Sequence, residues 1–380
     1  MYKRDVENQI QKVLEMGKIA ILYGARQTGK TTLATHLAKS YPNGEVLYLS
    51  CDEPDIDQAL TGKTSTELKS FIGDNKLIII DEAQRVADIG LTLKLLHDSF
   101  PGLKIIVTGS SSLELANKVS EPLTGRSVCL KLYPLSIREL MQKFSGVELK
   151  RILGEILRFG AYPEVVETAK ADVVPLLENI TQNYLYKDLL EFGEIKNSDL
   201  VRNLLQVLAL QLGNEVSLSE LSILLSVRKN TIKKYLELLE KAFIIYRLKP
   251  LARNKRNEVG KFKKVYFYDL GIRNMLIGNL NPMNLRNDVG ALWENFCINE
   301  RMKYLQFKRI PANTYFWRNY YGAEVDFIEE WAGEIRGYEF KWKKGRFTRP
   351  KAFLESYENS DVKLINMDGV EKLWSRYKEI

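Results

Sequence analysis

The chain has 380 residues, of which 45% are hydrophobic and 27% are charged, and its formal net charge is +8 at pH 7. This composition excludes a disordered chain, and the length exceeds that of an ordinary single domain, so we expect two or three hydrophobic cores. No apolar run is long enough to cross a bilayer, and the first residues lack the apolar centre of a signal peptide. We therefore predict a cytoplasmic protein without membrane contact.

The cysteine and histidine content limits the kinds of metal site that one chain can form. Cys51, Cys129 and Cys297 lie far apart, which favours reduced, buried thiols over disulfides or a zinc site. His36 and His97 are the only histidines, so a site built from several histidines is excluded. The positive net charge suits a polyanionic partner, although many basic proteins have none.

A phosphate-binding loop is predicted where GARQTGKT follows the strand-like run KIAILY and precedes the helical pattern LATHLAKSY. This is the pattern G-x-x-x-x-G-K-T, whose backbone N–H groups face phosphates at a helix N-terminus; a chance glycine-rich turn is the alternative. Lys30 would supply a charge to the outer phosphates, and Thr31 a hydroxyl to Mg²⁺. The residues predicted to contact ATP are Gly24, Ala25, Arg26, Gln27, Thr28, Gly29, Lys30, Thr31 and Thr32.

Two further strands are expected to end in polar residues. LIIIDEAQ, residues 77–84, reads as a buried strand in which Asp81 would hold Mg²⁺ and Glu82 would orient and deprotonate the attacking water. A solvated rim of acids is the alternative. The apolar run KIIVTGSSS ends in hydroxyls, of which Ser110, or nearly as well Ser111, would contact the outer phosphate or the water.

Arg126 in LTGR precedes the strand-like segment SVCLKLYPLS. It would stabilise charge on the transferred phosphoryl group, in its own chain or in a neighbour's site, or else form a surface ion pair. A shared arginine would require an oligomer, whose form the sequence does not specify. The alternation of strands and helices predicts an α/β domain over residues 1–145, with a parallel sheet covered on both sides and the nucleotide at the carboxyl ends of its strands.

The segments GARQTGKTTL, LIIIDEAQ, IIVTGSSS, LTGR and YPLSIREL together resemble a family of prokaryotic AAA-type P-loop ATPases that carry a C-terminal domain of unknown function. The resemblance continues at FGAYPEVV, where the family more often has two glycines before Tyr-Pro and this chain has Ala161. It covers nearly the whole chain. It implies ATP and Mg²⁺ as ligands and hydrolysis of ATP as the activity.

The middle of the chain is predicted to be a helical lid or connector over residues 146–212 and a winged helix-turn-helix over residues 213–275. The second helix of a winged helix usually lies in the DNA major groove, and the wing contacts phosphates. The predicted contact residues are Arg228, Lys229, Asn230, Thr231, Lys233 and Lys234 on the helix, and Arg253, Lys255, Arg256, Lys261, Lys263 and Lys264 on the wing. The alternative is a winged helix that makes internal or protein contacts while its lysines are solvated.

Residues 276–380 are predicted to form a C-terminal α/β domain with a helix over GALWENFCINERMKYL and strands over TYFWRN, AEVDFIEE and EIRGYEFKW. If the last two strands pair in antiparallel fashion, Asp326 lies beside Glu339 and Lys341. Adjacent carboxylates repel, which favours a divalent cation between them, and the lysine would orient or activate a water. The alternative is a half-exposed strand whose alternating charges keep one face hydrated.

A helix glutamate, a strand aspartate and Glu-x-Lys resemble the restriction-endonuclease-like PD-(D/E)xK superfamily, and the ATPase family above typically ends in such a domain. By this resemblance Glu294, Asp326, Glu339 and Lys341 are the site residues, with a second divalent metal on Glu294, Asp326 and Glu339. The basic run WKKGRFTRPK would help to hold a phosphate backbone.

The sequence therefore predicts an ATPase whose nucleotide state moves a winged helix and a nuclease-like domain, and whose C-terminal part binds DNA or RNA, with or without cutting it. The rival hypothesis is an ATP-dependent regulatory switch that uses the same two domains for protein contacts and cleaves nothing. A small-molecule kinase is disfavoured, because no acceptor site is recognisable and two further domains are present.

Overall fold

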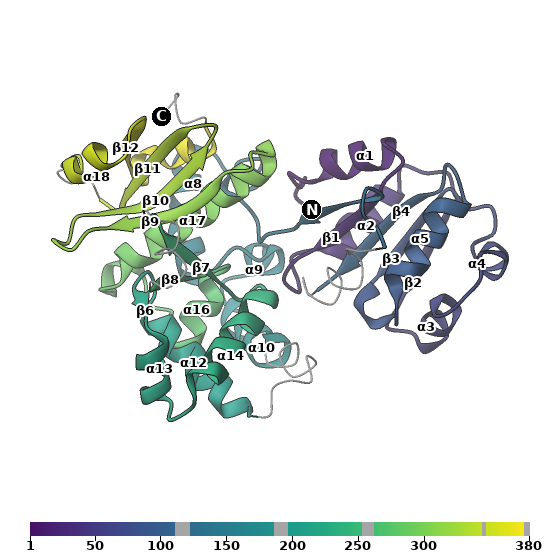
Figure 1. The fold of residues 1–380 in the computed structure, drawn as a ribbon, viewed down its shortest axis with the longest axis horizontal. Coiled ribbons are helices and arrows are strands. Elements are labelled where there is room, and N and C mark those ends of the chain that lie inside the picture. Colours follow the sequence, from purple (N-terminus) through teal and green to yellow (C-terminus); the bar gives the residue numbers. More distant parts are fainter. Residues whose placement is uncertain (111–121, 186–196, 253–261, 344–346, 376–380) are drawn as a thin grey trace. The chain divides into compact units, whose positions relative to one another are not determined.

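The computed structural model describes residues 1–110, 122–185, 197–252, 262–343 and 347–375. The chain forms two compact units (Figure 1), namely Met1–Pro134 with Lys241–Phe243, and Leu135–Glu240 with Ile244–Ile380. The sequence predicts four segments, and the boundaries predicted after residues 145, 212 and 275 all fall inside the second unit. None of the helices in the described ranges combines the length and the apolar character needed to span a bilayer.

The first unit contains a five-stranded sheet in the order β2-β3-β4-β1-β5, and every neighbouring pair is parallel. The predicted parallel sheet is confirmed. Because β1 lies between β4 and β5, the order of strands reverses beside it, and ligands of such sheets bind at this point. The elements are α1 (Glu7–Glu15), β1 (Ile19–Tyr23), α2 (Lys30–Ala38), β2 (Val46–Ser50), α3 (Pro54–Leu60), α4 (Ser65–Ile72), β3 (Leu77–Asp81), η1 (Ala83–Arg85), α5 (Ile89–Ser99), β4 (Lys104–Gly109) and β5 (Ser127–Lys131).

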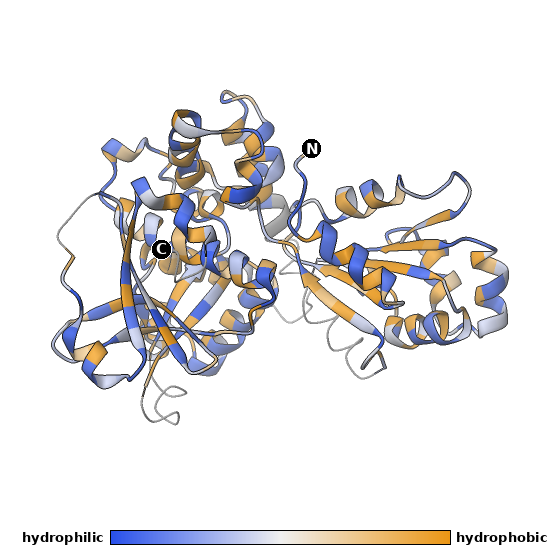
Figure 2. Ribbon diagram, turned by 90° about the horizontal axis from the view of Figure 1, so that it is seen from above, coloured by the Kyte–Doolittle hydropathy of each residue, from blue (hydrophilic) through white to orange (hydrophobic). Residues whose placement is uncertain are grey.

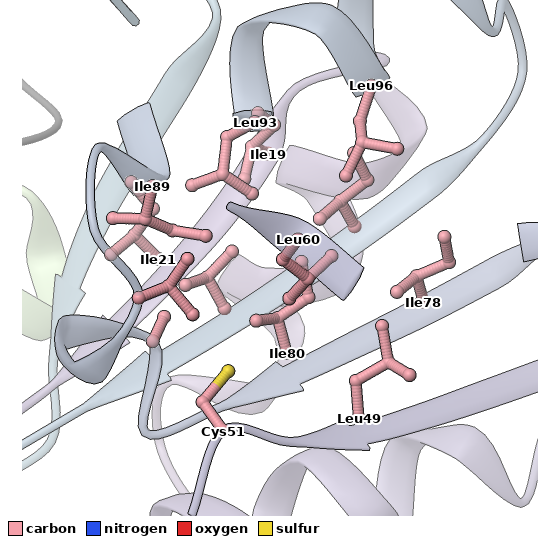
Figure 3. Packing of buried hydrophobic residues seen from close by; sticks show 14 of the residues in the cluster. Ile19, Ile21, Leu49, Cys51, Leu60, Ile78, Ile80, Ile89, Leu93 and Leu96 are labelled. Carbon is pink, nitrogen blue, oxygen red and sulfur yellow. The ribbon is translucent and has the colours of Figure 1, made fainter. Parts of the chain in front are cut away.

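The strands of the first unit are buried on both faces. In β3, Ile78 and Ile80 belong to a cluster with α3, α4 and α5 (Figure 3), whereas Leu77 and Ile79 belong to a second cluster with α1 and α2. The hydropathy colouring of Figure 2 shows the same strands as largely hydrophobic. Burial on two faces requires a continuous apolar run rather than alternation, which is the pattern that LIIID has.

The cysteines are all free, and one of them corrects a prediction. Cys51 and Cys297 are buried as expected, but Cys129 is exposed. It lies on β5, the outer strand of the sheet, so its side chain is not enclosed by neighbouring strands on both sides.

The second unit contains a seven-stranded sheet in the order β12-β11-β10-β9-β7-β8-β6. The pairs β7–β9 and β11–β12 are parallel, and the other pairs are antiparallel. The elements are α7 (Ile137–Leu140), α8 (Gly146–Phe159), α9 (Pro163–Glu167), α10 (Val173–Asn179), η2 (Ile180–Leu185), α12 (Ser198–Leu210), β6 (Glu215–Val216), α13 (Leu218–Leu224), α14 (Lys229–Lys241), β7 (Ile245–Pro250), β8 (Lys263–Phe267), α16 (Leu270–Leu276), η3 (Met283–Leu285), α17 (Val289–Lys308), β9 (Asn313–Arg318), β10 (Glu324–Trp331), β11 (Glu334–Lys341), α18 (Lys351–Ser356), β12 (Ser360–Asn366) and η4 (Met367–Trp374).

The segment predicted as a winged helix shares its sheet with the C-terminal segment. The order α13, α14, β7, β8 follows the prediction, and β6 pairs with β8. However, β7 also pairs with β9, with Lys249 opposite Tyr315 and Pro250 opposite Phe316. Residues 213–275 and 276–380 therefore contribute to one continuous sheet, and the winged helix itself stays a prediction.

The FGAYPEVV segment is held by a buried carboxylate from another part of the second unit. Asp269, at the N-terminus of α16, accepts hydrogen bonds from the N–H groups of Ala161 at 2.7 Å and of Gly271 at 2.9 Å. Gly160 has φ of +85°, and a Cβ there would lie 2.0 Å from Asp269 Oδ1. The glycine before Ala161 is therefore required, whereas the position of Ala161 itself accepts a side chain.

We expect Asp269→Asn to lower the free energy of unfolding of the second unit by about 1–3 kcal/mol, because the amide NH₂ cannot accept the bond from the Ala161 N–H. Burial raises the pKa of Asp269 to about 6, against the opposing effect of the backbone N–H groups. This folded-state pKa exceeds the ordinary 3.8. The contribution of this group to stability therefore falls as pH rises from about 4 to about 6, and the variant lacks that slope.

Thermal unfolding at several pH values measures both effects. Asp172→Asn is the matched control, because Asp172 is exposed at the N-terminus of α10 and its side chain makes no capping bond. Equal unfolding temperatures for the two variants would contradict the assigned role of Asp269.

Candidate functional site

The predicted phosphate loop connects β1 to α2, and its two glycines are conformationally required. A Cβ at Gly24 would lie 2.2 Å from the carbonyl oxygen of Leu132, and Gly29 has φ of +90° directly before the first residue of α2. Within the loop, Thr28 Oγ1 donates to the Ala25 oxygen at 2.8 Å. The free N–H groups of a helix N-terminus and the two glycines of the loop are the features that allow close approach of phosphate.

Lys30 folds back over the loop that would hold the phosphates. Its ammonium donates to the carbonyl oxygens of Gly24 and Ala25, each at 3.0 Å, and the residue is 5% exposed. This position places a positive charge directly beside the loop amides. The contact of Lys30 with the outer phosphates of a nucleotide stays a prediction.

Thr31 and Asp81, the two predicted ligands of Mg²⁺, meet at the carboxyl end of β3. Thr31 Oγ1 donates to both carboxylate oxygens of Asp81, at 3.0 and 2.9 Å. Asp81 also accepts hydrogen bonds from Tyr48 at 2.6 Å and from the buried hydroxyl of Thr108 on β4. Hydroxyl and carboxylate oxygens are the hard ligands that Mg²⁺ prefers together with phosphate oxygens, so the residues fit this ion.

The carboxylates at this edge give it a negative potential. Burial raises the pKa of Cys51 to about 12, and the charge of Asp81 adds to the rise. Burial likewise raises the pKa of Tyr48, as do its hydrogen bond to Asp81 and the charges of Asp52 and Glu82. A cation bound beside Asp81 would be attracted by the same carboxylates.

Glu82 follows Asp81 and is connected to Ser110. Glu82 has φ of +52°, a left-handed conformation that non-glycine residues seldom adopt, and its N–H donates to Thr108 Oγ1 at 3.2 Å. The amide nitrogen of Gln84 donates to the Glu82 carboxylate at 2.5 Å and to Ser110 Oγ at 3.0 Å. The predicted base and the predicted hydroxyl are thus joined through one side chain, while Ser111 lies outside the described residues.

Arg126 does not lie at this edge of the sheet. Its carbonyl accepts from the N–H of Ile19, the first residue of β1, so Arg126 lies at the amino ends of the strands. Its guanidinium forms an ion pair with Asp98, with nitrogen to oxygen distances of 2.7 and 2.9 Å. The geometry therefore does not support the predicted role in its own chain, because the phosphate loop follows the opposite end of β1. A role in a neighbour's site stays a prediction.

Sequence reasoning missed three residues of this site. Arg4 donates to the carbonyl oxygens of Thr28 and Tyr133, each at 2.6 Å, and so fixes the phosphate loop from outside the motif. Thr108 and Tyr48 both hold Asp81. Of the three, only Thr108 could have been predicted from the local sequence, since it is a hydroxyl residue near the end of an apolar strand.

In the second unit the predicted C-terminal site residues come together. β10 and β11 form the predicted antiparallel pair, with Phe327 opposite Tyr338, which places Asp326 opposite Glu339. Asp326 is 8% exposed and accepts from the N–H of Phe340 at 2.7 Å. Lys341 forms an ion pair with Glu339 at 2.7 Å.

A second lysine lies among these carboxylates. Lys264 of β8 is 4% exposed, donates to Glu294 Oε1 at 3.1 Å and forms an ion pair with Glu324. Tyr266 donates to the same oxygen of Glu294 at 2.5 Å. Burial lowers the pKa of Lys264, but the charges of Glu294, Glu324 and Asp326 outweigh this effect and the net shift is upward. Lys264 is therefore a charged, internal counter-ion, and the predicted role of this residue in phosphate contact was wrong because it is buried.

The residues of the C-terminal site do not fit the predicted second metal. Burial and the charges of Glu294 and Glu339 raise the pKa of Asp326 well above its ordinary range, while Lys264 opposes the rise. Across the described ranges, no three Asp, Glu, His or Cys side chains are arranged to hold a metal ion. The positive charge that these carboxylates need is supplied by an ammonium group.

The residues of the predicted recognition helix α14 are mostly exposed. The exposed ones are Arg228, Lys229, Asn230, Lys233 and Lys234, and Thr231 is half-buried. Of the predicted wing residues, Lys263 is half-buried, and Arg253, Lys255, Arg256 and Lys261 lie outside the described residues. A contiguous cationic start of α14 is thus available to a polyanion.

The fold of the first unit is that of an AAA-type, P-loop ATPase-like protein. Residues 16–141 match the family described as an AAA domain. Residues 150–282 and 289–373 match two families described as domains of unknown function, DUF8612 and DUF4143. These descriptions name no nuclease, so the endonuclease-like resemblance stays a prediction without further support.

Relatives of the chain are themselves uncharacterized. A protein of Mycobacterium tuberculosis is 27% identical over 343 residues, covering 89% of this chain and 74% of that protein. A protein of Methanocaldococcus jannaschii is 23% identical over 348 residues, covering 85% and 74%. The solved structure of the Walker-type ATPase PABY2304 of Pyrococcus abyssi is similar with a TM-score of 0.51 and 17% identity, covering 73% of this chain and 96% of that chain. At this identity the likeness concerns the fold alone.

Proposed function

We propose that the first unit binds Mg·ATP at the carboxyl ends of β1, β3 and β4 and hydrolyses it. The observation that carries this proposal is the hydrogen bonding of Thr31 to both carboxylate oxygens of Asp81. These residues lie next to the phosphate loop, whose carbonyl oxygens accept a hydrogen bond from Lys30. Three separate segments supply these groups, and each has the chemistry that a nucleoside triphosphate requires. The match to an AAA domain supports the same activity.

Each residue of the site has a role in this proposal. Lys30 would exchange its carbonyl partners for the outer phosphates, and the loop amides would bind phosphate oxygens. Mg²⁺ held by Thr31 and Asp81 would neutralise charge on the phosphates. Glu82 would orient the attacking water and accept its proton, and Gln84 would link Glu82 to Ser110, which senses the outer phosphate.

We infer that the second unit binds nucleic acid without cutting it. ATP hydrolysis would then control the binding of nucleic acid rather than its cleavage. The exposed cations at the start of α14 support binding. The ammonium of Lys264 among Glu294 and Glu324 argues against a metal-dependent nuclease. The regulatory switch stays the second candidate, since the same neutralised cluster fits a unit that makes protein contacts only.

Lys30→Ala is expected to lower ATP turnover by at least about 100-fold and to weaken ATP binding, because the charge beside the phosphates is lost. Phosphate release and binding of a fluorescent ATP analogue measure the two effects. Lys39→Ala, an exposed lysine just after α2, is the control and is expected to be unchanged. Normal turnover in Lys30→Ala would sink the proposed site.

A further inference from the structure

One end of the seven-stranded sheet gathers exposed aromatic residues. The turn between β9 and β10, residues 319–322, contains Tyr320 and Tyr321, which are 99% and 92% exposed. Their rings lie edge to face with centroids 6.0 Å apart. Phe262, directly before β8, is 54% exposed. Phe262 is separated from the tyrosines by β7. Aromatic side chains provide large contact areas at interfaces, and exposed ones of this kind indicate a partner.

The turn that carries the tyrosines, called the tyrosine turn below, is fixed by hydrogen bonds. The Asn319 side chain accepts from the N–H of Ala323 at 2.9 Å, and the Asn319 N–H donates to the Ala323 oxygen at 3.0 Å. Gly322 has φ of +86° and its N–H donates to the Asn319 oxygen at 3.3 Å. Both tyrosines are thus held out from the sheet by a closed turn, so that little conformational entropy would be lost on binding.

Strand pairing brings lysines to the same end of the sheet. Leu248 pairs with Lys264, which places Lys249 opposite Lys263 on β7 and β8. β9 runs parallel to β7 with Tyr315 opposite Lys249, and the chain continues from there through Arg318 into the tyrosine turn. The antiparallel pairing of β10 with β11 adds the exposed Lys341, at the end of β11.

The positive charges of Lys249 and Lys263 repel each other. Like charges directly opposite one another destabilise a sheet. Burial lowers the pKa of Lys263, the charges of Arg247 and Lys249 lower it further, and the charges of Glu240 and Glu237 oppose this shift. Two acids at this end have other cationic partners, since Glu215 pairs with Arg318 at 3.8 Å and Glu324 pairs with Lys264. A bound polyanion would relieve the repulsion between Lys249 and Lys263.

We propose that this end of the sheet binds single-stranded nucleic acid, with Tyr320 and Tyr321 stacked on unpaired bases and Lys249 and Lys263 facing phosphates. The proposal rests on the proposed function that the second unit binds nucleic acid, and it names the surface and the kind of nucleic acid. Aromatic residues interleaved with cations are the chemistry of sequence-tolerant single-strand binding. A protein partner would not require the paired lysines, and a duplex presents no free base faces.

The test uses the full chain and fluorescence anisotropy of a short labelled oligothymidylate and of the matching duplex. We expect the wild type to prefer the single strand. Tyr320→Ala with Tyr321→Ala is expected to weaken single-strand binding by about 10-fold or more, and the corresponding double Phe variant to stay within about 3-fold of the wild type. Lys249→Ala with Lys263→Ala is expected to weaken binding and to reduce the slope of log K against log salt by about 1 to 2.

The outcomes separate this inference from the function on which it rests. If the double Ala variant binds like the wild type while Arg228→Ala with Lys229→Ala abolishes binding, the tyrosine turn is not the site, and nucleic-acid binding by the second unit stands. If the double Phe variant is as weak as the double Ala variant, stacking is refuted. If the wild type binds neither oligonucleotide, both ideas fail. Unfolding temperature and ATP turnover serve as folding controls, because both tyrosines are exposed and lie outside the ATP site.

Discussion

Glu82→Gln is expected to lower the turnover of ATP by about 100-fold to 10,000-fold while ATP still binds, because a general base that accepts a proton in the transition state contributes that much. Glutamine keeps the shape of the side chain and its position beside Gln84, but it cannot take the proton of the water. The left-handed backbone of Glu82 and its bond to Thr108 keep the side chain at the carboxyl end of β3.

The distinctive readout of this variant is the split between turnover and binding. Single-turnover hydrolysis and titration with a fluorescent ATP analogue measure the two quantities. Glu53→Gln is the matched control, since Glu53 is an exposed carboxylate near the same edge whose side chain makes no capping bond to α3. If Glu82→Gln hydrolyses ATP at the rate of the wild type, another group activates the water.

Lys264→Met is expected to lower the free energy of unfolding of the second unit by about 3–5 kcal/mol, because it leaves buried carboxylates without their counter-ion. Methionine nearly preserves the length of the side chain, so the loss reports the charge rather than a cavity. The variant would leave the negative charges of Glu294, Glu324 and Asp326 without this counter-ion, which favours the entry of a divalent cation. We therefore expect Mn²⁺ to recover part of the lost stability in the variant and to leave the wild type unchanged.

Thermal unfolding with and without Mn²⁺ tests this expectation. Lys263→Met is the matched control, because the neighbouring lysine is half-buried and makes no ion pair with these carboxylates. Addition of Asp326→Asn to Lys264→Met is expected to abolish the recovery by Mn²⁺. If instead Mn²⁺ stabilises the wild type in a manner that requires Asp326, the cluster is a metal site and the nuclease hypothesis regains its basis.

Local pattern was sufficient to predict the loop and strand end at which we propose that the first unit binds ATP. The two glycines of the phosphate loop are required by backbone torsion and by close packing, the lysine and threonine follow at fixed spacing, and the acid ends an apolar strand. These features depend only on residues that are close in sequence. They can therefore be predicted from GARQTGKT and LIIIDE alone. The hairpin of β10 and β11 was predictable for the same reason, because the turn residues Ala332 and Gly333 follow an alternating strand.

Strand order and register determine which distant residues come together, which local sequence patterns do not predict. Arg126 stands just before an apolar strand in the sequence, yet the parallel direction of β1 and β5 places it at the edge away from the phosphate loop. Arg4 and Thr108 reach the proposed ATP site only because the fold brings their segments beside it. Lys264 reads as a wing cation in the sequence, but the pairing of β7 with β9 joins two segments into one sheet and buries this lysine among carboxylates. The sequence thus determined which chemical groups exist and how their own segments fold, whereas tertiary structure decided which groups meet, because contacts across a sheet depend on pairing between distant segments.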